Sequence, residues 1–147
     1  AEVEVDPHTG HVALVGYHVV DDFGHMLNPM LVEGQVHGGA AQGIGQALME
    51  HVVYDDEGQL LSGSFMDYAL PRARDLPFFR FETEPVPSTA NVLGVKGCGE
   101  AGTVGALAAV ANAVQDALWD QGVRQADMPF TPLRVWTMLN SHDMAAE

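Results

Sequence analysis

Glu100 is the residue best placed to do chemistry, because it lies in a glycine-rich turn just before a long apolar helix. The turn reads Gly-Val-Lys-Gly-Cys-Gly-Glu-Ala-Gly over residues 94–102. Glycine lets a backbone approach a bound molecule closely, and a carboxylate held beside such a molecule can act as a general base. The same carboxylate can instead complement the dipole of the following helix, which contributes about 0.3–1 kcal/mol. From these residues alone, the structural role is favoured.

Residues 97–102 also match the dinucleotide fingerprint G-x-G-x-x-G. In that fold the pyrophosphate rests on the helix N-terminus, so Glu100 would present negative charge to negative charge. The segment that follows the helix, residues 122–127, is too polar to form the buried parallel strand that this fold requires. A dinucleotide-binding domain is therefore the least supported interpretation.

Two neighbours of Glu100 leave further alternatives open. Lys96 lies four residues earlier, where it suits either an ion pair or an anionic cofactor. Cys98 precedes a helix N-terminus, a position that favours a reactive thiolate, but no histidine is nearby in sequence and a small apolar filler is the favoured role. The seven histidines form no H-x-x-x-H pair, so no protein-ligated metal site is predicted.

Composition excludes several classes of function. The 147 residues suffice for one domain, 1–147, with a genuine core. The net charge of −14, from 20 acidic and 6 basic residues, argues against nucleic-acid binding. A single cysteine excludes an intrachain disulfide or iron–sulfur cluster and suits a reducing, cytoplasmic setting. The sequence starts at Ala1 in a strand-like pattern, so we expect it to be a piece of a longer protein.

Hydrophobic periodicity predicts an α+β fold of antiparallel hairpins packed with long helices. The hairpins are expected at residues 1–6 with 11–21, and at 51–54 with 59–61, and a further strand at 80–83. The helices are expected at about 30–50, 103–121 and 131–140.

The first of these helices contains five interior glycines, each of which costs about 1 kcal/mol relative to alanine. Close approach of another backbone or of a flat ligand would offset that cost. Tight packing of the helix on a sheet through small residues is the alternative, and the two explanations are equally supported. The glycines are Gly34, Gly38, Gly39, Gly43 and Gly45.

Three stretches together resemble the C-terminal part of the molybdopterin-binding large subunit of the xanthine dehydrogenase and aldehyde oxidase family, closest to the aerobic carbon monoxide dehydrogenase type. They are Val-Asp-Asp-Phe-Gly to Gln-Ala-Leu (20–48), Gly-Ser-Phe-Met-Asp-Tyr-Ala-Leu-Pro-Arg (63–72) and the glycine turn (94–102). Their order and spacing also fit, and the resemblance covers nearly the whole chain.

The resemblance implies site residues. Glu100 would be the general base that takes the proton from a molybdenum-bound hydroxyl, whose oxygen then attacks an electron-poor carbon. Gln42 would hydrogen-bond the pterin cofactor, and the backbone of the turn would line the same cavity. The lining residues are Lys96, Gly97, Cys98 and Gly99.

The resemblance also implies partners. The cofactor would be molybdenum-molybdopterin in its cytosine dinucleotide form, with iron–sulfur centres and FAD on partner subunits and an oligomeric complete enzyme. Carbon monoxide, aldehydes, purines and N-heterocycles all stay open as substrates, since the copper-carrying cysteine loop of the carbon monoxide enzymes is not in this chain. The alternative from another class is a stand-alone α+β binding module without catalysis.

Overall fold

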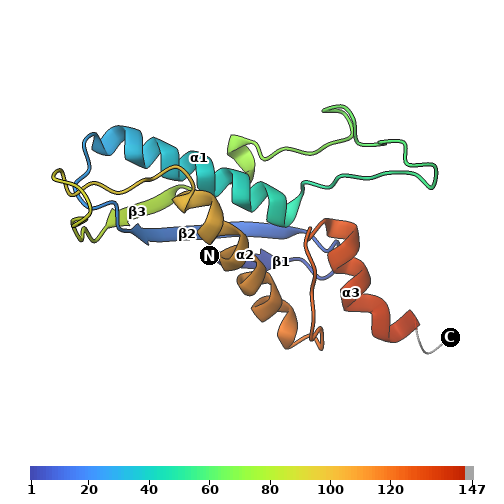
Figure 1. The fold of residues 1–147 in the computed structure, drawn as a ribbon. Coiled ribbons are helices and arrows are strands. Elements are labelled where there is room, and N and C mark those ends of the chain that lie inside the picture. Colours follow the sequence, from blue (N-terminus) through green and yellow to red (C-terminus); the bar gives the residue numbers. More distant parts are fainter. Residues whose placement is uncertain (145–147) are drawn as a thin grey trace.

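The computed structural model describes residues 1–144 and has the expected α+β architecture, with three long helices and a three-stranded sheet (Figure 1). The strands are β1 (Glu2–Val5), β2 (Val12–Asp21) and β3 (Phe79–Thr83), in the order β1-β2-β3. The helices are α1 (Pro29–Leu48), α2 (Ala101–Trp119) and α3 (Pro132–Met144), with a short 3-10 turn at Ala73–Asp75.

The sheet combines one expected and one unexpected pairing. β1 and β2 form the predicted antiparallel hairpin, with Val5 opposite Val12. β3 instead pairs with β2 in parallel, from Tyr17 opposite Phe79 to Asp21 opposite Thr83. This parallel pairing is possible because α1 and the long segment after it carry the chain back to the same end of the sheet.

The second predicted hairpin is reduced to a single antiparallel bridge between Tyr54 and Leu60. It lies in the segment that joins α1 to the 3-10 turn, which projects away from the body of the molecule (Figure 1). Within the described chain few groups pack against this segment, so the alternating pattern is not consolidated into a two-stranded ladder.

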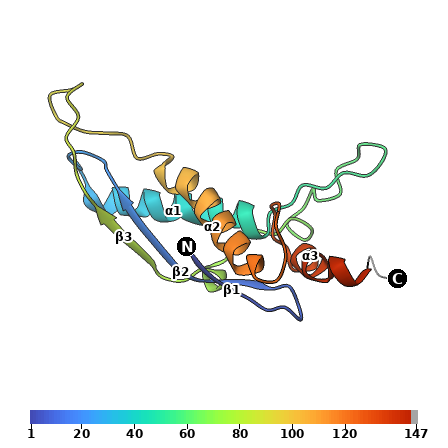
Figure 2. The ribbon, with the colours of Figure 1, turned by 90° about the horizontal axis from the view of Figure 1, so that it is seen from below.

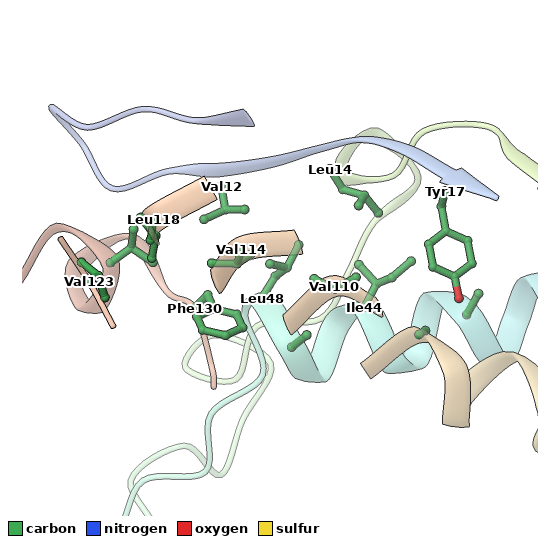
Figure 3. Close-up of a cluster of buried hydrophobic side chains, with 14 residues drawn as sticks. Val12, Leu14, Tyr17, Ile44, Leu48, Val110, Val114, Leu118, Val123 and Phe130 are labelled. Atoms are coloured by element: carbon green, nitrogen blue, oxygen red, sulfur yellow. The ribbon is translucent and has the colours of Figure 1, made fainter. Parts of the chain in front are cut away.

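α1 and α2 lie on the same face of the sheet, and the core fills the space between the two helices and the sheet (Figure 2). Along α2 every fourth residue is buried, as expected for a helix with one apolar stripe. Figure 3 shows this stripe meeting side chains of β2 and α1, and the core includes Val12, Leu14, Tyr17, Ile44, Leu48, Val110, Val114 and Leu118.

Small residues bring α1 and α2 into backbone contact. A Cβ added to Gly43 would lie 2.8 Å from the carbonyl oxygen of Thr103, and one added to Gly39 would lie 3.0 Å from the Thr103 amide nitrogen. From the other side, a Cβ on Gly102 would lie 2.3 Å from the carbonyl oxygen of Val36. Tight packing therefore explains part of the glycine-rich pattern of α1.

Two local signals set the start of α1. Asn28 is the N-cap, and its side-chain oxygen accepts a hydrogen bond from the amide of Leu31 at 3.2 Å. Pro29 occupies the first helical position, where its missing N–H has no consequence. No helix among residues 1–144 is long and apolar enough to cross a membrane.

We predict that Gly102→Ala destabilises the chain by more than about 2 kcal/mol, because its methyl group would force the backbones of α1 and α2 apart. Gly34→Ala is the matched control: a Cβ there meets no described atom within 4 Å, so it should stabilise the helix by up to about 1 kcal/mol. Urea unfolding of both variants checks this. Equal stabilities would contradict the packing role of Gly102.

Candidate functional site

The glycine turn is held against the loop that enters α1. Gly24 and Val95 form an antiparallel bridge, the amide of His25 donates to the carbonyl of Gly94 at 3.0 Å, and the amide of Lys96 donates to the carbonyl of Phe23 at 3.0 Å. In Figure 1 the loops before α1 and before α2 accordingly lie side by side. Two segments that are about 70 residues apart in sequence thus form one structural unit.

Gly24 is required at this junction. Its φ of +58° lies in the left-handed region, and an added Cβ would stand 2.1 Å from the carbonyl oxygen of Gly94. A side chain here would separate the loop from the turn.

One face of α1 is exposed beside the turn. We call it the open face of α1 and define it by Gly34, Gln35, Gly38 and Gln42, which share one side of the helix by their spacing and are all exposed. A Cβ added at Gly34 or Gly38 would meet no described atom within 4 Å. These two glycines are not explained by packing against the described chain, unlike Gly39 and Gly43.

Two glutamines connect the open face to the turn and to α2. Gln35 donates from its side-chain amide to the carbonyl of Gly99 at 3.2 Å. Gln42 accepts a hydrogen bond from the hydroxyl of Thr103 at 3.5 Å. The predicted cofactor ligand Gln42 therefore meets α2 at Thr103, three residues after the predicted base, Glu100. Gln35 was not predicted as a site residue, since only its partner Gly99, 64 residues away, reveals its position.

Glu100 is exposed at the N-cap of α2, and its side chain makes no capping hydrogen bond to the described first turn. Gly97 and Gly99, just before it, have open space where a Cβ would be. The carboxylate therefore makes no capping hydrogen bond in the described chain, and its place at the N-terminus of α2 still lets it complement the helix dipole, which was the structural alternative. A general base needs the exposure that Glu100 has.

Lys96 is paired, but with Asp22 and not with Glu100. Its ammonium group bonds Oδ2 of Asp22, and the pair is about one-third exposed. This ion pair, together with the amides of Val86 and Gly24, lowers the pKa of Asp22 from 3.8 to about 2. The charge of Lys96 is thus already matched within the chain, which leaves its backbone as the part predicted to line a ligand cavity.

A cavity of about 360 Å³ opens between the loop before α1 and the turn. Its walls include Phe23, Met26 and Leu31, with Gln35 and the half-buried Cys98 on the side of the turn. Another hollow, of about 420 Å³, lies at the far end of β2 beside Phe130 and contains none of the predicted site residues. Among the described residues, no group of three or more metal-ligating side chains is present.

The arrangement does not fit a dinucleotide fold. β3 ends well before the turn, and within residues 1–144 α2 is followed by α3 and not by a strand. In the described chain the glycine turn and α2 are therefore not part of a βαβ unit that would position a pyrophosphate.

Comparisons with known proteins agree with this geometry. Residues 1–77 match the family model described as molybdopterin cofactor-binding domain. The chain is 37% identical over 143 residues to the carbon monoxide dehydrogenase large chain of Hydrogenophaga pseudoflava, covering 97% of this chain and 18% of that protein. It is 44% identical over 133 residues to the nicotine 6-hydroxylase large subunit of Paenarthrobacter nicotinovorans, covering 90% and 16%.

Among solved structures, quinoline 2-oxidoreductase from Pseudomonas putida 86 superposes with a TM-score of 0.90 at 43% identity. The match covers 94% of this chain and 18% of that one. The chain thus spans less than a fifth of the length of these relatives.

We predict that the carboxyl of Asp22 titrates near pH 2 in the folded chain, because the charge of Lys96 and two amide N–H groups stabilise its ionised form. Its folded pKa is below the unfolded value, so its contribution to stability is complete above about pH 4 and is lost as the pH falls toward 2. NMR titration of the side-chain carbon measures this directly. A midpoint near 3.8 that Lys96→Met leaves unchanged would contradict the ion pair.

Proposed function

Because the chain belongs to the molybdopterin cofactor-binding domain family, as its sequence resemblance predicted, we propose that it is a catalytic segment of a molybdenum hydroxylase large subunit. In this proposal the open face of α1 and the glycine turn hold the cofactor, and Glu100 is the general base. The observation that carries the proposal is the exposed Glu100 among backbone positions where a Cβ would meet no described atom.

The donor set suits a flat, anionic cofactor. Gly34 and Gly38 on α1, and Gly97 and Gly99 in the turn, let a planar ring approach the backbone without steric conflict. Side-chain amides of Gln35 and Gln42 supply donors and acceptors at the same place. The N-terminus of α2 adds a partial positive charge, which stabilises negative groups. The bound cofactor would supply the redox chemistry, as a metal that accepts electrons from the substrate.

The residues of this chain would position and move the proton. Glu100 is anchored on one side by α2 and on the other by the paired segment that includes Lys96. Support from a rigid helix keeps a base within hydrogen-bond reach of the proton that it takes.

Exposed apolar side chains support the view that more protein covers this segment. Phe65 is 79% exposed, Met66 93% and Phe78 99%, all in or next to the projecting segment after α1. Large apolar groups exposed together mark protein contacts. We propose that the remainder of the large subunit covers these side chains. FAD-binding and iron–sulfur subunits would complete an oligomeric enzyme in the cytoplasm. Its cofactor would be the cytosine dinucleotide form of molybdopterin.

The substrate class follows from the relatives. Two relatives that are more than 40% identical are named for nicotine and quinoline, whose rings contain an electron-poor carbon beside nitrogen. We therefore place N-heteroaromatic compounds first among the substrates to be screened, ahead of carbon monoxide, aldehydes and purines.

We predict that Glu100→Gln in the complete enzyme keeps its molybdenum and pterin but loses turnover by about 10²–10⁴-fold, because the amide cannot accept the proton. Elemental analysis and steady-state kinetics measure the two effects. Glu57→Gln, an exposed residue on the projecting segment, is the matched control and should be fully active. Undiminished turnover in Glu100→Gln would leave the chain as a binding module without catalysis.

We predict that Gln42→Leu weakens cofactor retention by roughly tenfold, because a cofactor group left without its hydrogen-bond partner costs about 1–3 kcal/mol. Gln121→Leu, in the turn after α2, is the control with the same chemical change. Pterin and molybdenum remaining after extended dialysis report the difference. Equal retention by both variants would remove Gln42 from the cofactor site.

A further inference from the structure

Asp22 joins three separate segments of the chain. Its Oδ1 accepts hydrogen bonds from the amides of Gly24 and Val86, both at 2.9 Å. Its Oδ2 accepts a charged hydrogen bond from Lys96. One carboxylate thus links the loop before α1, the proline-containing segment after β3 and the glycine turn, across 64 and 74 residues of sequence.

The glycine stretch between Lys96 and Glu100 has few contacts of its own. A Cβ at Gly97 or Gly99 would meet no described atom within 4 Å, so side-chain packing does not fix these residues. Glycine also gives up the most conformational freedom when it is ordered. The position of Glu100 therefore depends on the anchors at the two ends of this stretch.

At the C-terminal end the anchor is α2, with Gln35 bonded to Gly99. At the N-terminal end the anchor is the pairing of Val95 and Lys96 with the loop before α1, which the Asp22–Lys96 ion pair closes. Asn91 braces the same end, because its side chain bonds both the amide and the carbonyl of Val95. Among these contacts, the bond between Lys96 and Asp22 is the one that joins two charged groups.

We propose that Asp22 is a positioning residue, which holds the glycine turn through Lys96 and so fixes the place of Glu100 at the cofactor. This inference rests on the proposed function of Glu100. In this proposal the ammonium group of Lys96 does not pair with a charge on the cofactor. It holds the glycine turn against Asp22, and the backbone of the turn lines the cofactor site.

The two oxygens of Asp22 allow a selective test. In Asp22→Asn the remaining oxygen can still accept from the amides of Gly24 and Val86, while an NH₂ group replaces the oxygen that bonds Lys96. Lys96→Met removes the other partner of the same ion pair, so the test does not depend on the folding of a single variant. Lys96→Arg keeps a cation and should restore the link.

In the complete enzyme, we expect Asp22→Asn and Lys96→Met each to lower kcat about 10- to 100-fold, since a small misplacement of a catalytic group has effects of this size. The double variant should be no worse than either single one, because both break one interaction. Molybdenum and pterin content should stay at the wild-type level. The hydrogen-bonded amides of Val95 and Lys96 should exchange hydrogen faster in both single variants, and Lys96→Arg should restore both kcat and exchange.

Asp6→Asn is the matched control. Asp6 caps the turn at the opposite end of β2, through the amide of His8 and the hydroxyl of Thr9. It should change neither kcat nor exchange at Val95 and Lys96. Glu100→Gln, measured in the same series, reports separately on the proposed function.

The outcomes are distinguishable. If Glu100→Gln abolishes turnover while Asp22→Asn and Lys96→Met keep full kcat and normal exchange, the positioning role is wrong and the proposed function stands. Loss of cofactor from Asp22→Asn would also overturn it, since Asp22 would then act in cofactor retention. If Glu100→Gln is fully active, the proposed function fails, and Asp22 then has no catalytic base to position.

Discussion

The backbone contact between α1 and α2 is the constraint on which the rest of the structure depends. An added Cβ at Gly39 or Gly43 on α1, or at Gly102 on α2, would crowd the other helix, so the close approach of the two backbones here depends on these glycines. Gly102 is the second residue of α2, and therefore the contact places the N-terminus of α2 against the middle of α1. The glycine turn and Glu100 precede that N-terminus, so the packing of the core also sets where the site lies.

The glycines of α1 divide by helix face. The glycines that face α2 allow the two helices to pack closely. Gly34 and Gly38 face outward and destabilise the helix, and no contact within the described chain offsets that cost. In the proposed function this exposed face receives the flat cofactor, beside Gln35, which bonds the turn, and Gln42, which bonds Thr103 of α2. Close approach of another backbone thus explains Gly39 and Gly43, whereas a flat ligand over Gly34 and Gly38 stays a prediction.

Local signals predicted the helices, the first hairpin and the α+β class, because caps, turn residues and periodicity act over a few residues. Asn28 and Pro29 mark the start of α1, and the buried residues of α2 recur every fourth position. The parallel pairing of β3 with β2, the Lys96–Asp22 pair and the Gln35–Gly99 bond could not be predicted in this way. Each of these three contacts joins segments that are more than 55 residues apart. No local sequence pattern predicts which distant segments come into contact. The roles of Glu100, Gln42 and the residues 96–99 came from a family resemblance and stay predictions.

The central claim is that the open face of α1 and the glycine turn form one cofactor site with Glu100 at its metal. An experimental structure of the complete, cofactor-loaded subunit tests this most directly. We predict that the pterin lies over Gly34, Gly38, Gly97 and Gly99, with the Glu100 carboxylate within hydrogen-bond reach, about 3 Å, of the coordination sphere of the metal. A cofactor bound elsewhere, or a Glu100 carboxylate that points away from the metal, would contradict it.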